Sequence, residues 1–273
     1  MLNYYEKMMK FINTVSLTAS VNDWLLNSRH PCILHVFDEA CNLINEHRDV
    51  LSIVTQQIGN GPFNLVIKDD ILFSEHVHVD SPIFMDNNQL ILGDLTINCA
   101  DSKPWCPRPD WEKLHVNRNI VRIQLASLPI TNYQPFLSNS QPSNFSTALV
   151  KADISSVKNI TSQLAGLGPG LTPAGDDFIM GAIYAAWILH PFQTARMLAE
   201  EIANTAAPLT TSLSAAWLRS AGKGEAGILW HQFFETLISH DHFQAKIAMD
   251  KILATGETSG ADAWAGFIGS FVL

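Results

Sequence analysis

The feature that most constrains the fold is an apolar run at residues 178–189, directly after two acidic residues, Asp176 and Asp177. The run is hydrophobic on nearly every helical face, so a helix formed here has to be buried on all sides. It is shorter than the roughly 20 residues that a membrane-spanning helix needs. It therefore predicts a core helix, and we expect no membrane span.

Helical signals surround this run from residue 152 onward. Asp153 is a predicted N-cap for a helix that ends at Gly166, and Pro173 is placed to begin the next helix. Amphipathic segments predict further helices at 193–206, 212–221, 225–239, 242–255 and 259–273. We expect residues 151–273 to form a helical domain that carries the functional site.

The N-terminal part of the chain combines an early helical pattern with short strand-like segments. Apolar spacing predicts a helix over 33–46. Turn-bounded segments predict strands at 50–55, 63–67, 71–74, 77–79, 82–85, 89–92 and 95–98.

Prolines punctuate residues 101–150, which predicts one helix beginning near Asp110 and otherwise a connection. The fold class is thus α+β. A β-rich domain over 1–150, with an early helix and a small sheet or partly open barrel, precedes the helical domain.

Charge and cysteine content narrow the class of partners and the compartment. The formal net charge is -9, from 17 basic and 26 acidic residues without a basic cluster, so we expect no nucleic-acid partner. The four cysteines lack metal-binding spacing, which indicates reduced thiols. Polar residues interrupt residues 1–21, so we expect no secretory signal and a cytoplasmic location.

The segment 166–177, GLGPGLTPAGDD, joins two predicted helices through a glycine-rich turn. No strand precedes the turn and it lacks the lysine of a phosphate loop, which excludes the Rossmann and phosphate-loop motifs. Glycines allow backbone N–H groups to converge at a helix N-terminus, where phosphate, carboxylate or a carbamoyl-type group is favoured. The candidate anion-binding residues of this turn are Gly166, Gly168, Gly170, Thr172 and Gly175.

Gly175 costs about 1 kcal/mol relative to alanine inside a helix, so we infer that another group approaches its backbone closely. The alternative for the whole turn is an ordinary connection in which Thr172 caps the next helix.

Asp176 and Asp177 need partners, because carboxylates beside a buried helix are costly when unpaired. The partner can be a divalent cation such as Mg²⁺, the N–H groups of a substrate amide, or an arginine. The sequence leaves these three open.

A second helix start resembles the first one. In the segment GETSGAD, Asp262 follows Thr258 by the same spacing as Asp176 follows Thr172. We expect the two helix starts to face one cavity, with an ordinary capped terminal helix as the alternative. This segment adds Thr258, Ser259 and Gly260 as binding candidates and Asp262 as a catalytic candidate beside Asp176 and Asp177.

Two further binding candidates lie between the two helix starts. Ser212 is placed at the beginning of a helix, and Arg219 can grip an anion through its guanidinium fork. The alternative for Arg219 is a surface position near a helix C-terminus.

The motifs GxGPGLTPxGDD and GxTSGAD resemble those of the bacterial domain-of-unknown-function family 2877. A weaker likeness extends upstream, to HVFxxAxNL from His35 and GNGPxxL from Gly59. The resemblance implies a subunit of oxamate carbamoyltransferase, which exchanges carbamoyl between oxalurate and phosphate in allantoin breakdown. It also implies a small anionic substrate such as carbamoyl phosphate, and partner subunits or a homo-oligomer.

Two other hypotheses remain open from the sequence. One is a non-catalytic module that binds a small anion or a nucleotide, which predicts saturable binding without turnover. The other is a structural scaffold, which predicts no ligand.

Overall fold

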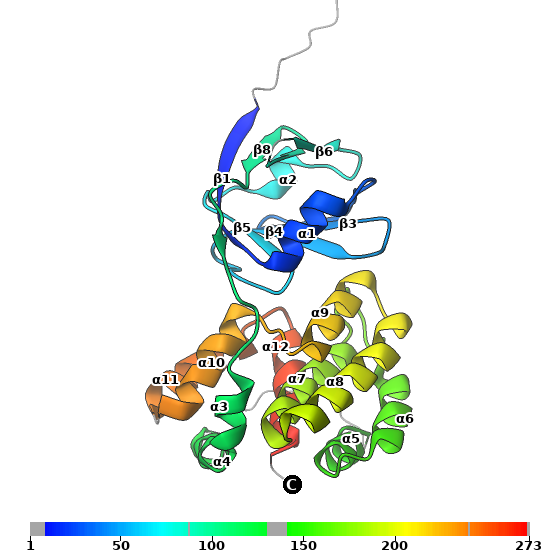
Figure 1. Ribbon diagram of the computed structural model, residues 1–273, viewed down its shortest axis with the longest axis vertical. Helices are drawn as coiled ribbons and strands as arrows, with labels where there is room; N and C mark the ends of the chain where they lie inside the picture. The colour runs from blue at the N-terminus through cyan, green and yellow to red at the C-terminus, as the bar shows by residue number, and fades with distance from the viewer. Residues whose placement is uncertain (1–8, 87, 130–140, 240, 272–273) are drawn as a thin grey trace, which may run out of the picture. The chain divides into compact units, whose positions relative to one another are not determined.

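The computed structural model describes residues 9–271 except for 87, 130–140 and 240. Residue contacts divide the chain into two compact units, Met1–Pro107 and Arg108–Leu273. Strands predominate in the first unit and the second is helical, as the labels and colours of Figure 1 show. The predicted fold class is confirmed.

The strands of the first unit form one nearly closed, barrel-like sheet. Their order is β2-β3-β4-β5-β1-β8-β7-β6, and β9 pairs with β1. The central strand β1 runs antiparallel to β5 and parallel to β8. The strands are β1 (Lys10–Leu17), β2 (Cys32–Val36), β3 (Ala40–Ile44), β4 (Val50–Val54), β5 (Asn64–Ile67), β6 (Ile83–Asp86), β7 (Gln89–Leu92), β8 (Leu95–Asn98) and β9 (Lys103–Pro104).

The predicted helix at 33–46 is wrong, because this segment forms the antiparallel strands β2 and β3. Strand β3 is also paired with β4, where Leu43 lies opposite Leu51 and both side chains are fully buried. The partner strand lies outside the segment, so local spacing did not reveal the pairing. The early helix is instead α1 (Ala19–Asn27), whose N-cap Thr18 accepts from the Val21 amide.

The predicted strands at 71–74 and 77–79 are also wrong. Residues Phe73–His76 form the short helix α2, and no strand covers 77–79. Phe73 is fully buried, and its carbonyl accepts from the Val77 amide, which closes the helical turn. The other predicted strands are confirmed to within about two residues at their ends, an ordinary uncertainty of element boundaries.

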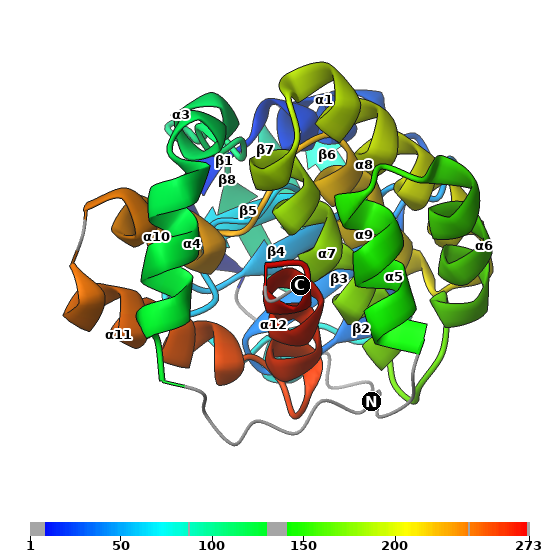
Figure 2. The same ribbon diagram turned by 90° about the horizontal axis from the view of Figure 1, so that it is seen from below.

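The second unit is built around α7, which is buried along nearly its whole length. Figure 2 shows α7 among the other helices, and α12 packs along it. The helices are α3 (Trp111–Val116), α4 (Arg118–Ser127), α5 (Gln141–Val150), α6 (Ile154–Leu164), α7 (Ala174–Leu189), α8 (Phe192–Ala206), α9 (Ser212–Gly222), α10 (Ile228–Ser239), α11 (His242–Leu253) and α12 (Ser259–Gly269), with a 3₁₀ turn at Ala207–Leu209. The predicted core helix and its neighbours are confirmed.

Residues 101–150 contain more regular structure than the expected connection. Helix α3 begins after Asp110, as predicted, but α4 and α5 follow it. Trp111 of α3 stacks on Tyr184 and Trp187 of α7. Contacts thus group residues 108–150 with the helices, while the boundary at residue 150 stays a prediction about independently folding domains.

Glycines let α7 and α12 approach each other closely. A Cβ atom on Gly181 would lie 1.8 Å from the Ala263 carbonyl oxygen, and one on Gly266 would lie 1.9 Å from that of Phe178. This contact brings the first turns of α7 and α12 together. Across the described ranges, no helix is long and apolar enough to cross a membrane.

Candidate functional site

Asp176 is the centre of a buried hydrogen-bond network at the start of α7. Its side chain is 1% exposed. Oδ1 accepts from the Gly166 amide at 2.9 Å, and Oδ2 accepts from the Ser214 hydroxyl at 2.8 Å and from the Thr210 hydroxyl. Burial raises the pKa of Asp176, and these three donors oppose the shift. Asp176 therefore ties the glycine-rich turn to the start of α9.

The sequence analysis missed Thr210 and Ser214 as partners of Asp176. The signal was present in the hydroxyl-rich segment TTSLS at 210–214. Thr211, rather than Ser212, caps α9 by accepting from the Ser214 amide at 3.1 Å, and it donates to the Leu171 carbonyl. Ser212 is the first residue of α9.

The close approach expected at Gly175 comes from the protein's own backbone. A Cβ atom there would lie 1.9 Å from the Leu164 carbonyl oxygen at the end of α6. The Gly175 amide donates to the Leu167 carbonyl at 2.8 Å. Gly175 and Gly166 thus both spend their amides inside the protein, and Gly175 allows α6 and α7 to pack closely.

The middle of the turn is different. Gly168 and Gly170 have φ values of 120° and 92°, which strongly favour glycine. Among the described residues, no protein acceptor is found for the amides of Gly168, Gly170, Leu171 and Thr172. Gly170 is exposed, and a Cβ atom there would meet nothing within 4 Å. This part of the turn leaves N–H donors for another molecule or for water.

The structure brings the two predicted helix starts together. The hydroxyls of Thr172 and Ser259 are hydrogen-bonded at 2.9 Å. Asp177 and Asp262 are 6% and 0% exposed, and their charges repel each other. Thr258 is the exposed residue before α12, while the Gly260 amide donates to the Thr255 carbonyl.

Asp177 has the most altered acidity of this cluster. Burial raises its pKa to about 8, and the neighbouring charges of Asp262 and Asp176 add to the shift. The hydroxyls of Ser259 and Thr172 oppose it. Within the described part of the chain, Asp177 Oδ2 is buried and has no hydrogen-bond partner. The junction therefore holds an acceptor that the protein does not satisfy.

The residues described do not contain three or more His, Cys, Asp or Glu side chains grouped to hold a metal ion. Asp176 already accepts three protein hydrogen bonds through its two oxygens. Mg²⁺ binding by Asp176 and Asp177 stays a prediction.

Arg219 lies exposed in the last turn of α9, whereas Ser214 in the first turns of the same helix faces Asp176. In the described structure, no hydrogen bond or ion pair joins the Arg219 side chain to the aspartates. Its predicted role in anion binding stays a prediction.

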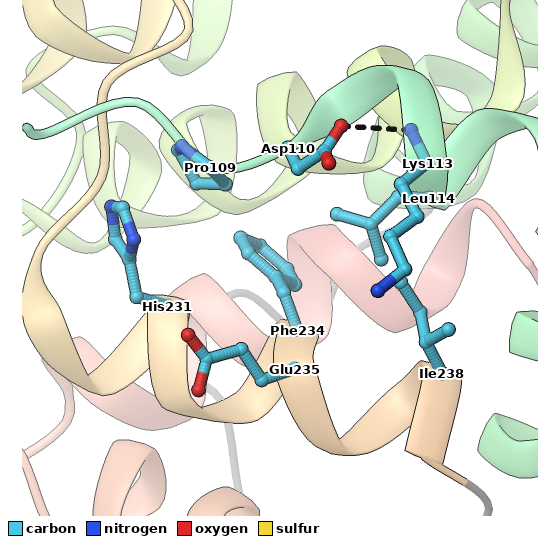
Figure 3. Close-up of a pocket in the computed structure, with 8 residues that line it drawn as sticks. All are labelled: Pro109, Asp110, Lys113, Leu114, His231, Phe234, Glu235 and Ile238. Atoms are coloured by element: carbon cyan, nitrogen blue, oxygen red, sulfur yellow. Dashed lines mark hydrogen bonds between the residues drawn. The ribbon is translucent and has the colours of Figure 1, made fainter.

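The helical unit also has cavities away from this junction. One, of about 260 Å³, lies between α3 and α10. Figure 3 shows Phe234 and Leu114 in its lining, with Lys113, Glu235 and His231 around them. Acidic and basic groups alternate there, so the cavity has no single charge preference.

Two family models match the chain. One is described as the AllH family N-terminal domain and matches residues 13–104, and the other as oxamate carbamoyltransferase subunit AllH and matches residues 164–271. The second match contains both helix starts and all three aspartates.

A β-rich unit followed by a helical unit, each matched by its own model, defines the class as a carbamoyltransferase subunit. The chain belongs to the family of the oxamate carbamoyltransferase subunit AllH. Partner subunits are expected for a member of this family. A search of the solved structures finds no match.

Proposed function

We propose that the protein is a subunit of an oxamate or oxalurate carbamoyltransferase, and that the junction of the glycine-rich turn, α7 and α12 binds a small anionic substrate. One observation carries this proposal. The same junction has backbone N–H groups at 168–172 without a protein acceptor and a carboxyl oxygen of Asp177 without a protein donor. Oxamate and carbamoyl phosphate each combine an anionic group with an amide NH₂. Such a ligand complements both features.

In this proposal the turn amides hold the phosphate or carboxylate oxygens, and Asp177 faces the amide nitrogen. Asp176 is a positioning residue, because its oxygens fix Gly166, Thr210 and Ser214. Thr172 and Ser259 join the two helix starts and so hold the turn beside Asp177. Asp262 keeps the pKa of Asp177 high through charge repulsion.

Asp177 is the proposed proton acceptor in carbamoyl transfer. The nitrogen of oxamate forms a bond to the carbamoyl carbon, while the bond from that carbon to the phosphate oxygen breaks. Phosphate leaves with the bonding electron pair, and the nitrogen gives its proton to the ionised Asp177 carboxylate. A pKa of about 8 suits this role, because both protonation states are accessible near neutral pH.

Binding measurements with the Asp177→Asn variant test the site. We expect calorimetric titration of the full chain with carbamoyl phosphate and with oxamate to give affinities about tenfold weaker in the variant. Asp153→Asn is the matched control, because Asp153 is an exposed N-cap of α6 and asparagine also caps. Equal affinity in folded Asp177→Asn, or no binding by the unmodified chain, would refute the proposal.

Two further measurements separate the remaining alternatives. Reduced affinity in Arg219→Ala would add Arg219 to the site, whereas unchanged affinity would leave the anion to the turn amides. Saturable binding without carbamoyl transfer, with partner subunits present, would instead assign the chain to the class of non-catalytic anion-binding or nucleotide-binding modules.

A further inference from the structure

A second pocket of the helical unit carries a distinct charge signature. It is a cavity of about 300 Å³ where α8 follows α7 and α9 ends. Its side chains are Arg108, Trp187, Phe192, Arg196, Glu200 and Lys223. Trp187 lies about 16 Å beyond Asp176 along the α7 axis, at about 1.5 Å per residue. The pocket is therefore separate from the aspartate junction.

The lining is strongly basic in a chain that is acidic as a whole. Arg108, Arg196 and Lys223 face the cavity, and Glu200 is its one acidic lining residue. Glu200 accepts from Arg196 Nε at 2.7 Å, which leaves the other guanidinium nitrogens of Arg196 outside that ion pair. Three positive charges against one negative charge leave a surplus of two within the lining.

Glu225 is the other acidic group that acts on this region. Burial raises its pKa, and the positive charges of Lys223 and Arg108 oppose the shift. Even with Glu225 ionised, the three cations outnumber the two carboxylates.

The basic groups are held in place by aromatic side chains. The Arg108 guanidinium lies 5.7 Å from the centre of the Trp187 ring and 5.6 Å from that of Phe192. Such stacking over an aromatic face restricts the guanidinium while its edge can still form hydrogen bonds. Phe192 remains 47% exposed, so this wall of the pocket is open to solvent.

Lys223 sits in a loop that two tryptophans fix. Trp187 Nε1 donates to the Ala221 carbonyl at 3.0 Å, and Trp111 Nε1 donates to the Gly224 carbonyl at 2.7 Å. Gly224 has a φ of 79°, and a Cβ atom there would lie 2.9 Å from Trp111 Nε1. The GKGE segment at 222–225 thus presents Lys223 from a rigid turn, which reduces the entropy lost when it binds a ligand.

We propose that this pocket binds a small oxyanion, a phosphate or carboxylate group held by Arg108, Arg196 and Lys223. Its volume suits a compact ligand, and guanidinium groups match the planar geometry of carboxylates and phosphates. The pocket is independent of the aspartate junction and adds a second anion site to the subunit.

The test is a titration of the full chain with inorganic phosphate and, separately, with acetate at low ionic strength. We expect saturable binding of at least one anion, and about tenfold weaker binding in the double variant Arg196→Gln/Lys223→Gln. The relative affinities of phosphate and acetate identify which oxyanion the pocket prefers.

Lys246→Gln is the matched charge control, because Lys246 forms an exposed i,i+4 pair with Asp250 just as Arg196 does with Glu200. Asp177→Asn separates this pocket from the aspartate junction. Binding that survives in both controls and weakens in the double variant supports the pocket. Binding that is unchanged in the double variant, or absent from the unmodified chain, overturns it.

Discussion

The Asp177 carboxyl keeps its proton at neutral pH far more than an exposed aspartate does. Its pKa rises from 3.8 to about 8 because the group is buried and lies near Asp262 and Asp176. Each pKa unit corresponds to about 1.4 kcal/mol, so ionising this buried group costs on the order of 5 kcal/mol. The cluster that would serve the reaction therefore destabilises the fold when it is charged.

This cost predicts a pH-dependent stability. Below the unfolded pKa of Asp177 both states are protonated, and stability is lost as the pH rises through its folded pKa of about 8. We expect chemical unfolding at pH 5 and pH 8 to show a smaller loss of unfolding free energy for Asp177→Asn than for the unmodified chain. Asp153→Asn should lose as much as the unmodified chain, because the pKa of exposed Asp153 is lowered. Parallel losses in Asp177→Asn and the unmodified chain would contradict this assignment.

Asp176 has the opposite energetic role, because its oxygens satisfy three donors. Asp176→Ala would leave the Gly166 amide and the Thr210 and Ser214 hydroxyls without this acceptor. We expect a loss of roughly 2–4 kcal/mol in urea unfolding. Asp241→Ala, which removes only an exposed N-cap of α11, should cost about 1 kcal/mol. Equal losses in the two variants would show that the Asp176 network contributes little.

The sequence predicted the aspartate junction better than its partners. The repeated spacing of Thr172 with Asp176 and Thr258 with Asp262 anticipated that the helix starts face each other. The contact of Ser214 with Asp176 depends on how α9 packs, so no local pattern announced it. The packing of Gly175 was anticipated only as a close approach, without its partner Leu164.

At the scale of elements, the contact between α7 and α12 holds the site together. It depends on two glycines, because α7 and α12 touch through backbone atoms at Gly181 and Gly266. Gly181→Ala or Gly266→Ala forces the helices apart, and we expect each to cost about 3 kcal/mol or more in urea unfolding.

Gly269→Ala is the control in the same helix, because its Cβ atom would meet only the Ser146 hydroxyl oxygen, at 3.2 Å. It should change stability by less than about 1 kcal/mol. A Gly181→Ala variant as stable as Gly269→Ala would contradict the close helix contact.

Helices and strands differed in how well the sequence predicted them. The caps Asp110, Asp153 and Asp241 are local signals, and each accepts from the backbone amide three residues later in the structure. The pairing of β3 with β4 is set by contacts outside the segment, so helical spacing at 33–46 was misleading. Local chemistry thus located helix starts, while tertiary pairing decided the β2–β3 hairpin.

At the scale of the whole molecule, the two units have separate hydrophobic cores. The cluster of the first unit includes Leu51 and that of the second includes Phe233, and the clusters share no residue. Units with independent cores unfold in separate transitions unless a strong interface couples them. We therefore expect two transitions when the chain is heated in a calorimeter.

A pair of core variants assigns these transitions. Leu51→Ala and Phe233→Ala each create a cavity at a fully buried position, which costs roughly 2–5 kcal/mol. Leu51→Ala should lower only the melting temperature of the β-rich unit, and Phe233→Ala only that of the helical unit, where both candidate anion sites lie. If phosphate binds there, it should raise the melting temperature of the helical unit alone. A single transition shifted by both variants would show instead that the cores unfold together, and ligand binding would then stabilise the whole chain.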